Sequence, residues 1–360
     1  MKKVVCIHLY NDFSGSPFVL SQSINTLSKN NYEVDLYTSN TEGFLTDTES
    51  NKFSVFYRRS NNKLGVLFYY LLSQIILFFK LLKYRNKDVI FYINTIMPFG
   101  AALAGKILGV KVIYHIHETS IRPKILKIFL KKVISYTSDF NIFVSKYLMK
   151  SDEIKSVQSS VIYNALPDKF TKKANLNMYK YNNESFIVLM ICSLKEYKGV
   201  YEFIKIANNC NIKKKIKFKL VLNTEQREID IFFKTTSIPN NVSLYSSQKD
   251  VSLFYREANL VLNLSRVDKW VETFGMTILE AMNYAIPCIV PPIGGPVEIV
   301  DNGVDGYCID SYKVNDISEI ILKLSEDEEL LLNLSCKALE KAKAFSSSNF
   351  EYNILKVVSK

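Results

Sequence analysis

The hydrophobic residues of this chain fall into short runs that alternate with amphipathic stretches. The runs "VVCIHLY" (residues 4–10) and "YEVDLYTS" (32–39) are typical of buried strands, and "FVLSQSINTLSK" (18–29) between them has helical spacing. The same unit returns at residues 88–94, 97–109 and 110–117, and a further strand run covers residues 139–145. Strands that alternate with helices predict a parallel sheet with helices on both faces.

A polar stretch around residues 164–185 interrupts this pattern before strand runs resume at 186–194, 217–223, 241–246, 259–265 and 287–292. The chain therefore predicts two doubly wound α/β domains. We place the first at residues 1–165, a linker at 166–184 and the second at 185–345, and expect residues 346–360 to form a helix that returns to the first domain. Ligands bind such sheets at the carboxyl ends of the strands, so a cleft between the domains is the expected site.

Composition narrows the choice of partners. The chain is 48% hydrophobic, enough for two cores, and its formal net charge is +11. Such a charge favours polyanions, phosphorylated ligands or an anionic membrane face, while the absence of a recognition motif argues against nucleic acid. Six scattered cysteines without a CxxC pair predict buried, reduced thiols of a cytosolic protein, and the three histidines lack the spacing of a zinc site.

Two stretches raise the question of a membrane. Residues 64–82 are nearly long enough to span a bilayer, but polar residues interrupt them, which favours a buried or half-buried helix. Residues 122–136 predict a helix that could rest on anionic lipid headgroups or could simply be solvated; it carries Lys124, Lys127, Lys131 and Lys132. The N-terminal residues turn polar too soon for a signal peptide.

The stretch "WVETFGMTILEAM" carries two glutamates eight positions apart. We expect Glu272 to lie in a loop and Glu280 in about the second turn of a helix that begins at Phe274 or Gly275. The first backbone N–H groups of that helix, at Gly275, Met276 and Thr277, could bind an anion with the help of the helix dipole. A nucleotide sugar fits this arrangement: Glu280 would bind ribose, the helix start the diphosphate and Glu272 the sugar. The alternative is one solvated loop glutamate and one helix-face glutamate.

The next segment, "PPIGGPVEIV", predicts a strand, a glycine-rich turn and a helix start. Gly294 and Gly295 would allow a ligand to approach the backbone closely, and Pro296 suits the first position of a helix. An ordinary strand–turn–helix connection explains the proline as well, but explains the double glycine less well.

With these motifs in place, the chain resembles the retaining glycosyltransferases of family 4. Glu272 and Glu280 stand at the family's E-x7-E positions, and "EAM", "IP" and "GGPVEIVDNGVDG" follow in the family's order and spacing. The resemblance covers nearly the whole chain and is densest over residues 262–309. It implies the GT-B fold, in which two Rossmann-like domains face each other across a cleft.

The resemblance also assigns individual residues. Lys198 matches the lysine that neutralises the donor diphosphate, and His117 matches the histidine that contacts the transferred sugar near the reaction centre. Ser193 stands where the family usually has an arginine, a missing cation that Lys195 could partly replace. We interpret His115 as structural. The predicted catalytic residues are His117, Glu272 and Lys198, and the predicted donor-binding residues are Gly15, Ser193, Lys198, Glu272, Phe274, Gly275, Met276, Thr277 and Glu280.

The function that the resemblance implies is transfer of a sugar, with retention, from a nucleotide-sugar donor to a glycan or lipid-linked acceptor in bacterial surface-polysaccharide assembly. No Asp-x-Asp motif is present, so we expect neither an essential metal nor a cofactor. The expected location is the cytoplasm, either free or peripheral on the inner face of the membrane. Two alternatives remain: a catalytically silent glycan-binding or partner subunit, which Ser193 suggests, and a nucleotide-sugar epimerase of similar fold. The lack of GxGxxG after an early strand disfavours a dehydrogenase.

Overall fold

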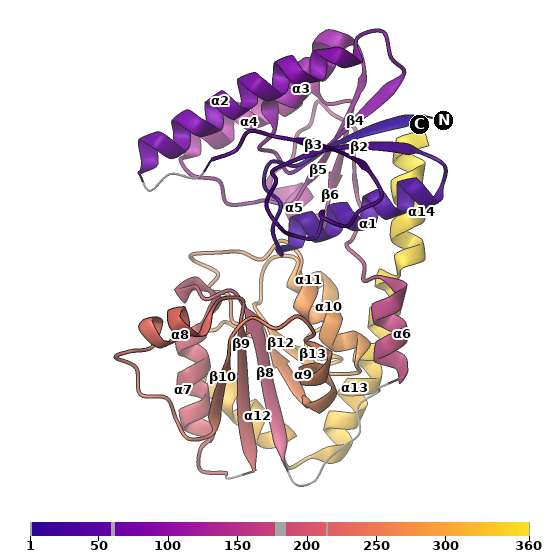
Figure 1. The fold of residues 1–360 in the computed structure, drawn as a ribbon. Coiled ribbons are helices and arrows are strands. Elements are labelled where there is room, and N and C mark those ends of the chain that lie inside the picture. Colours follow the sequence, from indigo (N-terminus) through magenta and orange to yellow (C-terminus); the bar gives the residue numbers. More distant parts are fainter. Residues whose placement is uncertain (1, 59–61, 177–184, 214, 360) are drawn as a thin grey trace. The chain divides into compact units, whose positions relative to one another are not determined.

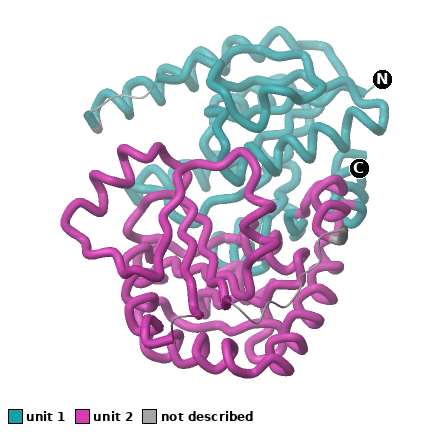
Figure 2. The backbone as a smooth tube through the Cα atoms, turned by 60° about the horizontal axis from the view of Figure 1, so that its bottom comes forward, with its two compact units in different colours: residues 1–164, 348–360 teal, residues 165–347 magenta. Residues whose placement is uncertain are grey.

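The computed structural model describes residues 2–58, 62–176, 185–213 and 215–359. The chain divides into two compact units (Figure 2). Unit 1 consists of residues 1–164 together with residues 348–360, and unit 2 of residues 165–347. The C-terminal segment therefore belongs to the same unit as the N-terminus.

Unit 1 is built around a seven-stranded sheet with the order β3-β2-β1-β4-β5-β6-β7 (Figure 1). Its strand pairs are all parallel over the described residues. The central strands are buried along almost their whole length, which explains why the sequence shows continuous apolar runs rather than alternation. The strands are β1 (Lys3–Ile7), β2 (Glu33–Thr38), β3 (Asn51–Ser54), β4 (Val89–Asn94), β5 (Lys111–Ile116), β6 (Phe140–Phe143) and β7 (Ser159–Val161).

Helices connect these strands and cover the sheet. They are α1 (Gly15–Lys29), α2 (Lys63–Leu81), the short 3₁₀ helix η1 (Leu82–Tyr84), α3 (Phe99–Leu108), α4 (Lys124–Thr137), α5 (Lys146–Ser151) and the C-terminal α14 (Ser347–Ser359). Local chemistry sets several of their ends. The Ser145 hydroxyl caps α5 by accepting from the Leu148 N–H at 3.2 Å, and Gly109 ends α3 in the left-handed conformation that glycine adopts without strain.

Unit 2 contains a six-stranded parallel sheet with the order β10-β9-β8-β11-β12-β13. The strands are β8 (Phe186–Cys192), β9 (Ile216–Leu222), β10 (Val242–Tyr245), β11 (Leu260–Leu262), β12 (Cys288–Val290) and β13 (Gly306–Cys308). The helical segments are α6 (Asp168–Leu176), η2 (Glu196–Lys198), α7 (Val200–Cys210), α8 (Gln226–Phe232), α9 (Ser252–Glu257), α10 (Met276–Asn283), α11 (Pro296–Ile299), α12 (Val314–Leu324), α13 (Glu328–Ala342) and η3 (Lys343–Phe345).

Both sheets confirm the doubly wound α/β prediction, and in both the strand order reverses next to the first strand. The reversal lies between β1 and β4 in unit 1 and between β8 and β11 in unit 2. The connections diverge at these points, and the carboxyl ends of the flanking strands leave a crevice in which ligands bind. The residues that follow β1, β4, β8 and β11 are therefore placed for function.

Part of the predicted linker is helical. Residues 168–176 form α6, which belongs to unit 2 because Phe170 packs edge-on against Tyr284 and Lys173 pairs with Asp250 at 2.7 Å. Polar composition concealed this helix, since its few apolar residues suffice for one contact face. Residues 177–184 of that stretch lie outside the described residues.

The thiols also differ from expectation in one respect. All six cysteines are free, in agreement with the absence of a disulfide framework. Cys6, Cys210 and Cys288 are buried, but Cys336 is exposed. It lies on the outward side of α13, so the prediction of buried thiols is wrong for this residue.

Candidate functional site

In unit 2, a charged cluster lies in the segments that follow β8 and β11. Lys198, at the end of η2, forms an ion pair with Glu272, which lies in the loop before α10. The Ser265 hydroxyl donates to the same carboxylate oxygen at 2.6 Å. Both ion-pair side chains are mostly buried, at 18% and 15% exposed. The structure thus brings together two predicted site residues that are 74 positions apart.

The electrostatics of this cluster keep Glu272 ionised. Burial acts to raise its pKa, but the Lys198 ammonium and hydrogen bonds from Lys198, Ser265 and Trp270 outweigh burial and hold the pKa below its ordinary value. Trp270 stacks on Tyr197 at 5.3 Å between ring centroids, and the Lys198 ammonium lies 5.6 Å from the Trp270 centroid. The lysine ammonium therefore lies over the Trp270 ring, within the range of a cation–π interaction.

The N-terminus of α10 begins directly after this loop. Gly275 is its N-cap, with φ +127°, so a side chain there would be strained and a Cβ would come within 2.6 Å of Ile278 Cδ1. Met276 and Thr277 form the first turn, whose N–H groups have no partner within the helix. This end of the helix accordingly presents donors and a positive dipole, as the sequence predicted. The ring of Phe274 is buried and packs edge-on near Phe345, so only its backbone could face a ligand.

Glu280 lies in the second turn of α10 and has a different environment from Glu272. Its carboxylate accepts a hydrogen bond from the Tyr255 hydroxyl at 2.6 Å. Burial raises the pKa of Glu280 to about 7, and the Tyr255 bond offsets this only in part. The two glutamates of the E-x7-E motif are therefore distinct: one is held ionised beside a cation, and burial raises the pKa of the other to about 7.

The two glycines of "PPIGGPVEIV" serve the protein itself. The Gly295 N–H donates to the Glu272 carbonyl at 2.8 Å, and a Cβ on Gly295 would lie 2.2 Å from the Thr273 carbonyl oxygen. A Cβ on Gly294, which has φ +100°, would lie 2.4 Å from the Glu272 oxygen. Glycine is thus required here by the backbone of the Glu272 loop, and the two glycines fix where that loop lies; the approach of a ligand to them stays a prediction.

The surroundings of Ser193 and Gly15, two other predicted donor-binding residues, say less about a role in binding. Ser193 follows β8 and its carbonyl accepts from the Lys195 N–H at 2.8 Å, while the Lys195 side chain is exposed. Gly15 is the first residue of α1, and a Cβ there would meet no atom within 4 Å. No protein contact requires glycine at that position, so its role stays a prediction.

In unit 1, the three histidines of the chain gather at the carboxyl ends of β1, β4 and β5. The side chain of Asn94, the last residue of β4, joins two of them: its amide nitrogen lies 3.1 Å from His8 Nδ1, and its carbonyl oxygen lies 2.8 Å from His117 Nε2. The rings of His115 and His117 are 4.4 Å apart between centroids, and His115 Nδ1 lies 2.7 Å from the Tyr92 hydroxyl.

Burial sets the charge of this histidine cluster. Burial lowers the pKa of His8 to about 4 and that of His115 to about 3, and it lowers the pKa of His117 well below the ordinary value, with His115 and His8 adding to the effect. All three imidazoles are neutral at pH 7. If the Asn94 amide donates to His8 and its carbonyl accepts from His117 Nε2–H, then Nδ1 of His117 is left as an acceptor for a hydroxyl group.

Sequence reasoning missed three residues that the structure adds to these clusters. Asn94 and His8 directly end or follow buried strands, and a polar residue at such a position was the signal that could have found them. Ser265 likewise follows β11. Neighbouring Arg266 makes a two-point contact with the buried Glu202, with its Nη2 at 2.8 Å and its Nε at 3.2 Å from the carboxylate oxygens. Over the described part of the chain, no three His, Cys, Asp or Glu side chains are grouped as a metal site would require.

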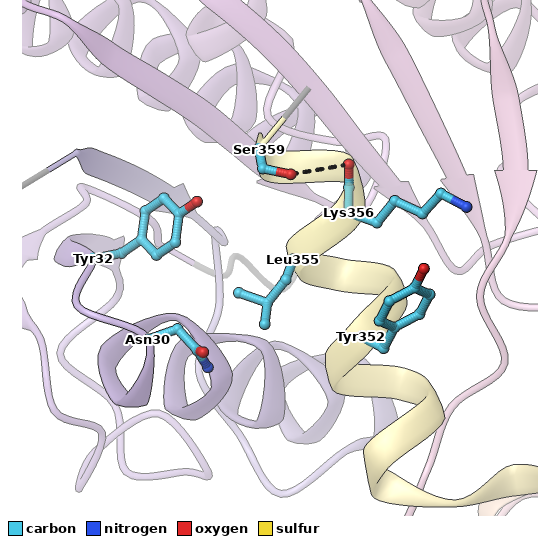
Figure 3. Close-up of a pocket in the computed structure, with 6 residues that line it drawn as sticks. All are labelled: Asn30, Tyr32, Tyr352, Leu355, Lys356 and Ser359. Carbon is cyan, nitrogen blue, oxygen red and sulfur yellow. Dashed lines mark hydrogen bonds between the residues drawn. The ribbon is translucent and has the colours of Figure 1, made fainter.

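Two surface depressions of unit 1 lie elsewhere. One is lined by Asn30 and Tyr32, which precede β2, and by four residues of α14 (Figure 3). A second lies beside the amino ends of β1, β4 and β5. Both are at the opposite end of the strands from the histidine cluster and hold none of the predicted site residues.

Two sequence families match the chain, one for each part. The model described as "Glycosyltransferase Family 4" matches residues 14–168, and "Glycosyl transferases group 1" matches residues 172–341. Among curated relatives, N-acetyl-alpha-D-glucosaminyl L-malate synthase of Bacillus anthracis is 24% identical over 369 residues, which cover 94% of this chain and 92% of the relative.

Solved structures match along the full length. Anabaena HepE in complex with UDP and glucose has a TM-score of 0.78 and 18% sequence identity, with complete coverage (100%) of both chains. A TarM variant of S. aureus in complex with Fondaparinux, alpha-GlcNAc-glycerol and UDP has a TM-score of 0.77 and 14% identity, again covering 100% of both.

Proposed function

Because the chain belongs to the group 1 glycosyltransferases of family 4 and has their GT-B fold, we propose that it transfers a sugar from a nucleoside-diphosphate sugar to a hydroxyl acceptor with retention of anomeric configuration. The observation that carries this proposal is the Lys198–Glu272–Ser265 cluster beside the N-terminus of α10. A cation and a carboxylate thus precede a helix that offers N–H donors at its start and the second carboxylate, Glu280, in its second turn.

The nucleotide half of the donor belongs with α10. The N–H groups at Met276 and Thr277 and the dipole of the helix favour a diphosphate, and Glu280 accepts hydrogen bonds from the ribose hydroxyls. Lys198 is the cation for the diphosphate. When the donor binds, the Lys198 ammonium is shared between the phosphate and Glu272. Charge-assisted bonds to the ligand then replace part of the ion pair within the protein.

For the sugar half, the candidate residue of unit 2 is Glu272 and the candidate residue of unit 1 is His117. Glu272 is held ionised and in a fixed position by Ser265 and Lys198, so it can accept hydrogen bonds from sugar hydroxyls. His117 is neutral and carries a free acceptor at Nδ1 when Nε2–H donates to Asn94. The resemblance to family 4 assigns both residues to the transferred sugar.

Retention follows from attack on the face that the nucleotide leaves. The acceptor oxygen forms its bond to the anomeric carbon as the bond from that carbon to the phosphate oxygen breaks, and the acceptor proton passes to the departing phosphate. We assign no side chain as covalent nucleophile. Lys198 and the α10 N-terminus supply the positive charge that stabilises the leaving diphosphate, so the reaction needs neither a metal nor a cofactor.

The acceptor is proposed at the level of class. A glycan or lipid-linked acceptor in bacterial surface-polysaccharide assembly fits the family resemblance and the net charge of +11, and places the enzyme in the cytoplasm at the inner face of the membrane. HepE was crystallised with UDP and glucose, and TarM with UDP, which supports a uridine diphosphate sugar as the first donor to try.

The test is a screen of nucleoside diphosphates and their sugars for thermal stabilisation, followed by product analysis. A ligand that binds the folded state adds about 2.7 kcal/mol to the free energy of unfolding when its concentration is one hundred times its Kd. The melting temperature rises as a result. Release of nucleoside diphosphate from a stabilising donor, slow in water and faster with acceptor, supports transfer. Conversion of the donor without acceptor would indicate an epimerase, and binding without turnover would indicate a silent subunit.

A further inference from the structure

Helix α2 carries a continuous apolar stripe that the rest of unit 1 leaves uncovered. Leu64 is 81% exposed, Phe68 61% and Ile75 56%, and further exposed side chains on the same helix are those of Val66, Leu67, Leu71 and Phe79. Positions 64, 68, 71, 75 and 79 recur at the helical period, so they form one face. In Figure 1, α2 is the long helix that flanks the sheet of unit 1.

The opposite face of α2 anchors the helix in unit 1. Ser73 and Gln74 are fully buried there, together with Tyr70, Leu77 and Leu81. The Gln74 side chain accepts from the Gly100 N–H at 3.1 Å, and a Cβ on Gly100 would lie only 2.2 Å from the Gln74 carbonyl oxygen. The backbones of α2 and α3 therefore cross in close contact, which holds α2 against the unit.

This anchoring decides between two interpretations of an apolar helix. Residues 64–84 are long and apolar enough to cross a membrane by length and composition, yet only 28% of the apolar window is buried. A core helix would bury most of it. A membrane span would pull Gln74 and Ser73 away from their partners and into hydrocarbon, at a high cost for the amide. A helix that keeps one face on the protein and lays the other on a surface satisfies both observations.

The neighbouring helix α4 adds to the exposed surface. The ring of Phe99 on α3 packs edge-on against Tyr70 of α2 at 5.9 Å and against Phe129 of α4 at 5.2 Å, which ties the three helices together. On α4, Ile125 and Ile128 are 76% and 57% exposed. Unit 1 thus offers exposed apolar side chains on α4 in addition to those on α2.

Charge identifies what covers this surface. Residues 62–137 contain twelve Lys or Arg and two Asp or Glu, and α2, α3 and α4 contain no acidic residue at all. Lys127 and Lys131 of α4 are directed to Asp152, at 2.7 and 3.4 Å, so the expectation of four lipid-facing lysines is reduced to the exposed Lys124 and Lys132. A second copy of the chain would oppose like charges here, whereas an anionic surface complements them.

We propose that the outward face of α2, with Ile125, Ile128, Lys124 and Lys132 of α4, lies in the interface of an anionic phospholipid bilayer. The helix of 19 residues is about 28 Å long, parallel to the membrane plane, and its apolar stripe enters the boundary between headgroups and acyl chains while the lysines bind phosphate. This names the surface for the membrane location that is part of the proposed function, and its test is independent of sugar transfer, because vesicle binding is measured without donor or acceptor.

The experiment uses the full chain and sedimentation with vesicles of phosphatidylcholine alone or mixed with phosphatidylglycerol. Wild type should sediment with the anionic vesicles, less at higher salt because the lysine contribution is screened. The triple variant Leu64→Glu, Phe68→Glu, Ile75→Glu should lose at least about tenfold in partitioning, since three apolar contacts are lost and three repelled charges are added. The pair Lys124→Glu, Lys132→Glu should lose binding to anionic vesicles.

Matched controls lie in unit 2. Ile212, Ile231 and Leu253 are 75%, 64% and 58% exposed, so the variant Ile212→Glu, Ile231→Glu, Leu253→Glu changes charge and surface hydrophobicity equally. The variant Lys205→Glu, Lys217→Glu, at two exposed lysines, is the control for the variant Lys124→Glu, Lys132→Glu. Both controls should bind vesicles like wild type. The proposal is overturned if wild type does not sediment with anionic vesicles, if the α2 variant binds equally well, or if that variant instead abolishes a dimer seen by ultracentrifugation.

Discussion

At the residue scale, the two glutamates of one motif have opposite electrostatics because of what each one touches. Glu272 lies beside Lys198 and Ser265, which hold its pKa down against burial, whereas Glu280 has only the neutral Tyr255 hydroxyl, so burial raises its pKa. The same residue type eight positions apart therefore becomes a fixed charge in one place and a titrating group in the other.

Lys198→Ala should lower the affinity for nucleoside diphosphate by about tenfold or more, because a charge-assisted contact of about 1.5–3 kcal/mol is lost. Glu272→Gln should leave nucleoside diphosphate affinity nearly unchanged and lower turnover, because the sugar loses its alignment. Calorimetry with diphosphate and intact donor, beside turnover, measures both. Lys205→Ala, at an exposed lysine of α7, is the control. Equal diphosphate affinity in Lys198→Ala and wild type would remove Lys198 from the site.

Glu280→Gln should change how stability depends on pH. The pKa of Glu280 is raised from 4.5 to about 7, so the folded state holds its proton more tightly than the unfolded state. Its contribution is fully present below pH 4.5 and is lost as pH rises through 7. The glutamine variant lacks this loss and should gain on the order of 1–3 kcal/mol relative to wild type at pH 8, and little at pH 4.5.

Melting curves of wild type and Glu280→Gln at several pH values give the difference directly. Glu319→Gln, at an exposed glutamate of α12, should show no such trend. The same Glu280→Gln protein should bind nucleoside diphosphate more weakly, because the ribose loses an anionic acceptor. A stability difference that is constant with pH would mean that burial does not raise the Glu280 pKa.

Asn94→Leu tests the histidine cluster. The side chain is similar in size but can neither accept from His117 nor donate to His8. We expect turnover to fall by about 10–100-fold, in the range observed when a partner that orients a functional imidazole is removed. Diphosphate affinity should stay unchanged, because Lys198 and α10 are intact. A parallel loss of melting temperature and of diphosphate binding would assign Asn94 a structural role only.

At the element scale, short connections decide where the site loops lie. The β12–α11 turn carries Gly294 and Gly295 against the Glu272 loop, and Gly199 brings the start of α7 against Leu264, where a Cβ would lie 2.2 Å from the carbonyl oxygen. Three glycines therefore fix the positions of the two segments that carry Lys198 and Glu272. Close packing of backbone on backbone is one physical reason for glycine at these positions.

Gly295→Ala should destabilise the protein by about 1–3 kcal/mol or more, since its Cβ would overlap backbone atoms of the Thr273 region. It should also weaken donor binding, because the Glu272 loop must move. Gly15→Ala is the matched control: its Cβ meets nothing within 4 Å, so stability should not fall. If Gly15→Ala nevertheless weakens donor binding at unchanged melting temperature, the predicted donor role of Gly15 gains support.

At the scale of the whole molecule, the chain crosses from unit 1 to unit 2 and returns. Helix α14 buries Phe350, Ile354, Val357 and Val358, and the Val357 carbonyl accepts from Lys111 Nζ at 2.8 Å. The last residues of the chain thereby complete the core that the first residues begin, which makes unit 1 dependent on a segment more than 180 residues away from the rest of it.

Ile354→Ala should therefore cost about 2–5 kcal/mol of unfolding free energy in unit 1, the range for a buried isoleucine that leaves a cavity. Tyr352→Ala, at a side chain that is 65% exposed, should cost much less. Denaturant unfolding of the two variants, with diphosphate binding by unit 2 as a second readout, separates loss of unit 1 from general unfolding. Equal stability of both variants would show that α14 contributes nothing to the core.

The sequence by itself determined the fold class and the local positions of the two motif glutamates. Continuous apolar runs are buried parallel strands wherever helices alternate with them, so the two sheets followed from pattern alone. The E-x7-E spacing placed Glu272 in a loop and Glu280 in the second turn of a helix, because helix geometry is local. At residues 168–176 the polar composition predicted a linker, whereas the structure has a helix. A polar helix can pack through only a small apolar face, which composition does not reveal.

Only the tertiary structure decided which residues meet. The pairing of Lys198 with Glu272, the joining of His8 and His117 by Asn94, and the opposite pKa shifts of the two glutamates all depend on strands that are adjacent in the sheet but distant in sequence. The same holds for α2: its hydrophobicity is visible in sequence, but which face remains uncovered depends on the close crossing with α3. Local geometry is encoded residue by residue, whereas burial and charge are properties of neighbours that the chain brings together only when it folds.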